Sequence, residues 1–130
     1  MKPIADWDEL TSELLIAVPE FRAVYDEHVR FNGQLLFDIL LCELYGFAVA
    51  MIEEEGNGAD DFLRRLFAYV ERGVASPSEQ LNTPFVISFL NMVHPDDPQF
   101  STLVPYMLPR SRAEWETYMG MRLPPGGPVA

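Results

Sequence analysis

One stretch, from residue 34 to residue 52, limits the folds open to this chain more than any other. It is apolar on nearly every face that a helix would present, and only Asp38, Glu43 and Gly46 interrupt it. A helix that is hydrophobic all round is either packed among other elements or placed in a membrane. Together with the three glutamates that follow, the stretch predicts a helix over about residues 34–55.

A membrane span is the competing interpretation, since residues 35–52 approach the length of about 17–25 residues that crosses a bilayer. Asp38 and Glu43 argue against it, because a carboxylate near the bilayer centre costs about 2.5–3.5 kcal/mol. The stretch is also flanked by glutamates where a span favours lysine or arginine. We therefore interpret it as the central helix of a bundle, with the other helices around it.

Helix signals recur along the rest of the chain, and no alternation typical of strands is long enough to count. Asp6 and Glu9 have the spacing of a capping box. Pro19 suits the first turn of a second helix, which should run to about residue 30. Ser76 is followed by a proline and, three residues on, by Glu79, which predicts another helix start.

These signals predict an all-α fold, a single-domain bundle of five to seven helices around the helix at about 34–55. We expect the domain to cover residues 1–122, with a disordered Pro/Gly tail at 123–130. Trp115 and Tyr118 are expected to close the core near the C-terminus.

The formal charge of −11 is carried by the first half of the chain. Residues 1–62 hold 14 acids against Lys2, Arg22 and Arg30, whereas residues 63–130 hold six acids and six arginines. Such a chain should repel nucleic acid and anionic membrane and attract a basic protein. The single cysteine excludes an intramolecular disulfide, and no signal-peptide pattern opens the chain, so we expect a cytoplasmic protein.

Catalytic and metal-binding patterns are missing from the sequence. His28 and His94 are the only imidazoles, so a three-histidine zinc site cannot form. His28 continues an apolar stripe and is expected at the edge of the core. Cys42 lies within the most apolar helix, where burial suppresses the thiolate, and is expected to be a small core residue. We predict a protein that is not an enzyme and holds no cofactor or metal.

The end of the central helix carries three consecutive glutamates, Glu53, Glu54 and Glu55. An exposed carboxylate at this negative end of a helix costs about 0.3–1 kcal/mol. The run either keeps the helix end soluble or is retained for a partner. Asp60 and Asp61 follow, four residues before two arginines. We predict a partner-binding set of seven acids: Asp38, Glu43, Glu53, Glu54, Glu55, Asp60 and Asp61.

Four short stretches resemble a family of small, acidic, all-helical bacterial proteins. They are AVPE at 17–20, EH at 27–28, NGQLL at 32–36 and SFLNMV at 88–93, and the resemblance spans about residues 10–118. Many members are uncharacterised, and some resemble immunity proteins of polymorphic or contact-dependent toxin systems. The resemblance implies a cognate toxin as partner, such as a basic nuclease, covered by an acidic surface. A small helical adaptor or regulator is the alternative.

Overall fold

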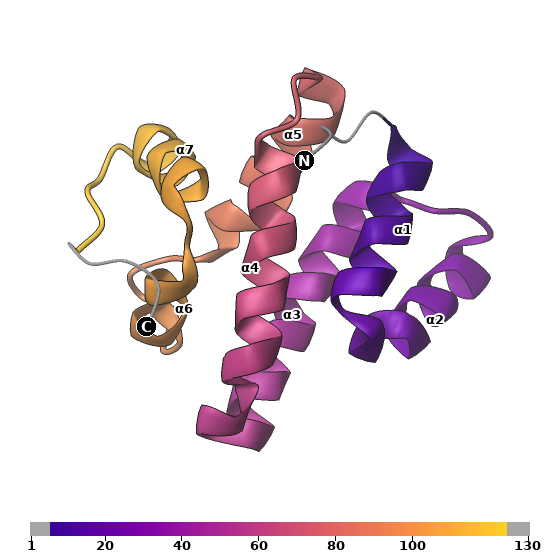
Figure 1. Cartoon of the computed structure of the whole chain (residues 1–130), viewed down its shortest axis with the longest axis horizontal. Coiled ribbons are helices and arrows are strands. Elements are labelled where there is room, and N and C mark those ends of the chain that lie inside the picture. The colour runs from indigo at the N-terminus through magenta and orange to yellow at the C-terminus, as the bar shows by residue number, and fades with distance from the viewer. Residues whose placement is uncertain (1–5, 125–130) are drawn as a thin grey trace.

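All regular structure in the computed structural model, which describes residues 6–124, is helical (Figure 1). Within these residues the chain forms α1 (Trp7–Ala17), α2 (Arg22–Asn32), α3 (Phe37–Glu55), α4 (Asp60–Val74), α5 (Glu79–Ser88), α6 (Phe100–Leu103) and α7 (Pro109–Met119). Four 3₁₀ turns join them: η1 (Pro19–Phe21), η2 (Gly56–Ala59), η3 (Leu90–Met92) and η4 (Val104–Tyr106). The predicted all-α bundle is confirmed.

Local sequence explains where most of these helices begin and end. The Asp6 carboxylate accepts the backbone N–H of Glu9 at 2.8 Å and caps α1, as its spacing predicts. Pro19 occupies the first position of η1, directly before α2. Gly33 ends α2 with φ 72° and Gly56 ends α3 with φ 55°, a region of φ that side chains other than glycine rarely adopt.

The predicted helix start at Ser76 is wrong by two residues. Helix α5 begins at Glu79, and Ser78 is its N-cap residue. Ser76 is buried, and its backbone N–H donates to the carbonyl of Gly73, so it closes the last turn of α4. Its own carbonyl accepts the Asn82 side chain at 2.8 Å. The capping-box spacing could not show that the preceding helix still uses this serine.

Helix α4 stands in the middle of the bundle, with α1 and α2 on one side and α6 and α7 on the other (Figure 1). It packs against α1, α5 and α7. It lies close to α5 at Gly73, where an added Cβ would lie 2.2 Å from the ring of Phe85. That ring also contacts Phe37 of α3 and Tyr69 of α4 edge-on, so these three helices share one aromatic core.

The C-terminal helix closes the core through one of its two predicted aromatic residues. Trp115 is buried, and its indole N–H donates to the carbonyl of Val93 at 2.8 Å. Tyr118 is exposed. Leu123, which the sequence places in the tail, is buried and donates its backbone N–H to Glu116 at 2.8 Å. The carbonyl of Pro124 accepts the Arg112 side chain, and residues 125–130 of the predicted tail lie outside the described residues.

Helix α3 is the predicted central helix, and it packs against α5, η2 and α2. These neighbours do not surround it, because a strip along its length remains exposed. Ile39, Cys42, Gly46 and Ala50 all lie on this strip. No helix in the described part of the chain combines the length and the apolar character that crossing a membrane requires.

Candidate functional site

The three glutamates that end α3 take no part in the side-chain hydrogen bonds and ion pairs of the described residues. Glu53, Glu54 and Glu55 are exposed, and none of them forms a hydrogen bond or ion pair with another residue of the described range 6–124. The backbone N–H of Gly56 caps the helix by donating to the Ile52 carbonyl. No basic residue lies in the last turn to offset the helix dipole.

The other first-half acids within the described residues contribute to the fold where they stand. Asp6 caps α1, while Asp8, Glu9 and Asp38 lie in first turns, where the helix dipole favours a carboxylate. The remaining ones are paired with an arginine or a histidine: Glu13, Glu20, Asp26, Glu27, Glu43, Asp60 and Asp61. Among these acids, only the three α3 glutamates both lie at a helix end whose dipole disfavours a carboxylate and lack a partner among the described residues.

Asp60 and Asp61 open α4 but are committed to neighbours within the fold. Asp60 accepts the Tyr106 hydroxyl at 2.6 Å and the Arg64 Nε at 3.0 Å. These two hydrogen bonds, that of Tyr106 first, lower the pKa of Asp60. Asp61 accepts the Arg65 Nε at 2.9 Å. The predicted i, i+4 pairs are therefore confirmed, and Asp60 ties η4 to α4.

Asp38 and Glu43 do not join the other predicted acids in one cluster. Asp38 is exposed in the first turn of α3. It lies 15 residues before Glu53, which at 1.5 Å per residue is about 22 Å along the helix. Glu43 lies between them and contacts His28 at 2.6 Å. The seven residues thus mark two ends and the middle of α3 and the start of α4.

The His28–Glu43 pair resembles an acid–base dyad, but both imidazole nitrogens serve the fold. Nε2 accepts the backbone N–H of Leu36 at 3.0 Å, so Nδ1 carries the proton and donates to Glu43. His28 is buried, as predicted for a core-edge residue. The pair links α2 to α3. In the described residues, no group of three histidine, cysteine, aspartate or glutamate side chains is arranged to hold a metal ion.

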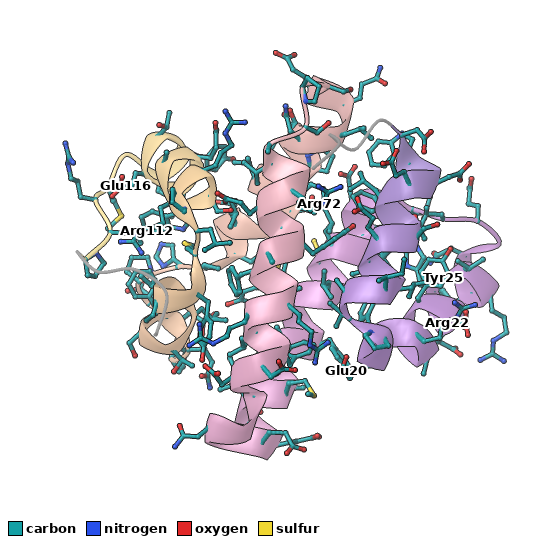
Figure 2. The ribbon with its side chains drawn as sticks, viewed as in Figure 1. Glu20, Arg22, Tyr25, Arg72, Arg112 and Glu116 are labelled. Carbon is teal, nitrogen blue, oxygen red and sulfur yellow. The ribbon has the colours of Figure 1, made fainter. Side chains whose placement is uncertain are left out.

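Arginines from the second half of the chain neutralise acids of the first half. Arg65 pairs with Glu20 at 2.6 Å and donates to the Ala17 carbonyl at 2.7 Å. Arg72 pairs with Glu13 at 2.7 Å. Figure 2 shows Arg72 reaching from α4 toward α1, and Glu20 lying below α1 on the same side of α4. The hydrogen bond from Arg65 lowers the pKa of Glu20. The difference in charge between the two halves of the sequence is therefore reduced on the surface of the folded protein, where these acids and arginines lie side by side.

The prediction that Cys42 is a core residue is wrong, because its side chain is exposed on α3. It belongs to the exposed strip, which we call the outer face of α3 and define by Asp38, Ile39, Cys42, Gly46, Ala50 and Glu53. The signal for it in the sequence was the i, i+4 spacing of Asp38, Cys42, Gly46 and Ala50. Because the opposite side of the helix is equally apolar, this spacing alone did not distinguish the exposed side.

The fold and the surface together define a small all-α protein with an uncovered helix face that has a carboxylate at each end. The chain belongs to a family described as Domain of unknown function (DUF7674), whose model matches residues 11–120. Comparison with curated proteins and with solved structures found no match.

Proposed function

We propose that this chain is a non-catalytic binding protein of the cytoplasm that neutralises a cognate bacterial toxin by covering it with an acidic surface. One observation carries the proposal: Glu53, Glu54 and Glu55 stand exposed and unpaired at the negative end of α3. Carboxylates in that position cost stability. A basic partner, such as a nuclease that holds phosphate, would gain both affinity and association rate from them.

The geometry narrows the predicted acidic surface. Asp60 and Asp61 are paired with arginines and Glu43 with a histidine. We therefore assign these three acids mainly to stabilising the fold, and only secondarily to binding the partner. The proposed contact acids are Glu53, Glu54 and Glu55, with Asp38 at the far end of the same helix. The resemblance to immunity proteins supports the choice of a toxin as partner.

A growth assay tests the proposal. The gene adjacent to that of this chain in its source genome is expressed alone and together with this chain. We expect toxicity alone and rescue on co-expression. Reversal of Glu53, Glu54 and Glu55 to lysine should abolish rescue. Reversal of the exposed Asp8, Asp26 and Glu114 changes the net charge equally and should preserve it. If neither gene product affects the other, the proposal is wrong.

A second candidate, a small adaptor or regulator that holds a peptide, is favoured by the apolar residues exposed on the outer face of α3. The two candidate functions differ in how strongly binding depends on the charge of the three glutamates. Changing the three glutamates to glutamine would leave adaptor binding unaltered, whereas binding to a basic toxin would weaken and lose its dependence on salt.

A further inference from the structure

The outer face of α3 lies between two hollows that expose large apolar side chains. The hollow toward α2, about 470 Å³, is lined by Val24, Phe31 and Glu43 among others. The hollow toward α5, about 550 Å³, is lined by Asp38 and Ile87 among others. Because Glu43 and Asp38 both belong to α3, the two hollows border the same helix.

Three exposed apolar residues gather at this helix and its borders. Phe31 is 84% exposed, Ile39 48% and Ile87 47%. One exposed apolar side chain is ordinary on a soluble protein, but several on one face mark a contact surface. Cys42, Gly46 and Ala50 continue the face with small side chains, so another helix could approach α3 closely, with an axis separation of about 8–10 Å.

The charged side chains on the outer face and in the lining of the two hollows are acidic. Asp38 lies at one end of the face and Glu53 at the other, and neither forms a hydrogen bond or ion pair with another described residue. Glu79 of α5 lines the same hollow as Asp38. Neither the outer face nor the lining of the two hollows includes a lysine or arginine among the described residues. A ligand for this face therefore needs apolar side chains in its middle and cations at its ends.

We propose that the outer face of α3 docks an amphipathic, basic helix of the partner protein. This rests on the proposed function, because it assumes that the partner is basic. The distance of about 22 Å between the end carboxylates corresponds to about four turns of the docked helix. Apolar residues of that helix lie over Cys42 and Gly46, and its lysines or arginines reach Asp38 and Glu53.

A second copy of this chain is a poor occupant of the same face. If two α3 helices pack in parallel, Asp38 meets Asp38 and Glu53 meets Glu53. If they pack antiparallel, Asp38 of each copy meets Glu53 of the other. Both arrangements bury apolar surface but also bring like charges together, and this repulsion destabilises the dimer. Charge complementarity therefore selects a basic helix.

Gly46 provides a test that leaves the fold intact. Apart from the neighbouring residues and the backbone of its own helix, no atom lies within 4 Å of a Cβ added there, and the residue has no positive φ. Gly46→Gln should therefore fold at least as stably as the wild type, because glycine is a poor helix former. Its longer side chain would occupy the middle of the face and hold a docked helix away.

The probe is a synthetic, fluorescein-labelled helical peptide of about 18 residues, with leucines along one face and lysines at both ends of that face. The control peptide has glutamate in place of lysine. We expect the basic peptide to bind, the acidic peptide not to bind, and Gly46→Gln to weaken binding at least about tenfold by fluorescence anisotropy. Saturating peptide should slow the reaction of Cys42, the only cysteine, with a maleimide at least about tenfold.

Several other results would contradict the docking proposal. Equal binding of both peptides removes its charge argument, and unchanged binding to Gly46→Gln or an unprotected Cys42 places the peptide elsewhere. A dimer in sedimentation that Gly46→Gln dissociates would assign the face to a second copy. In the growth assay, rescue by Gly46→Gln but not by the triple lysine variant would overturn the docking site and leave the proposed function standing. If the peptide docks on this face but the neighbouring gene is not toxic, the proposed function is overturned and the docking site stands.

Discussion

Replacing Glu53, Glu54 and Glu55 by glutamine should stabilise this protein. All three carboxylates lie in the last turn of α3, exposed, with no cation in that turn. Each costs about 0.3–1 kcal/mol against the helix dipole. Because neighbouring effects are not additive, we expect a combined gain in the free energy of unfolding of about 1–2 kcal/mol.

The gain is measurable by thermal unfolding followed by circular dichroism. For a domain of this length, about 1 kcal/mol shifts the Tm by about 3–4 °C, so the triple variant should unfold about 3–8 °C higher. Urea denaturation should show a higher midpoint with an unchanged m-value. The difference should nearly vanish in about 1 M NaCl, where the Debye length is about 3 Å.

The matched control removes charge from the opposite kind of helix end. Asp8→Asn and Glu79→Gln change exposed carboxylates in the first turns of α1 and α5, where the dipole favours them, and should lower stability slightly. A triple variant that is less stable than the wild type would refute the reasoning. So would a gain that persists in high salt, because the glutamates would then not oppose the dipole.

Three further predictions follow from particular contacts. Gly73→Ala should lower the free energy of unfolding by about 1–3 kcal/mol in urea denaturation, because its Cβ would meet the ring of Phe85; an unchanged midpoint would contradict this. Glu71 accepts the backbone N–H groups of residues 110 and 111 at the start of α7, so Glu71→Ala should cost about 1–2 kcal/mol, measured in the same way. The pKa of Glu20 is lowered by Arg65, so its contribution is complete above the ordinary pKa of 4.5 and is lost as the pH falls through the lowered pKa. Glu20→Gln should thus reduce stability at pH 7 more than at pH 3, and equal losses would refute the linkage.

Most helices follow from local chemistry and were predictable. The spacing of Asp6 and Glu9 and the positions of Pro19 and Gly33 set helix ends without help from the rest of the chain. The start of α5 was predicted wrongly because Ser76 donates to the end of α4. Both helix ends compete for that residue, and only the path of the chain between them decides the outcome.

The candidate site was only partly predictable. The positions of Glu53, Glu54 and Glu55 at a helix end follow from the sequence, and so does their cost. That they remain unpaired, while Glu13 and Glu20 are neutralised from α4, does not. Those ion pairs join residues 45 or more positions apart, and no spacing rule predicts contacts at such separations.

By itself the sequence determined that this protein is helical, where most of its helices end, and that α3 can be buried on any side. The tertiary structure alone decided which side of α3 stays bare, leaving Cys42 exposed and Leu44 in the core. The physical reason is that helix propensity and capping act over a few residues, whereas burial depends on which other helices pack alongside. The sequence of a helix that is apolar on every side does not determine which side is buried. The helices that pack against it determine this.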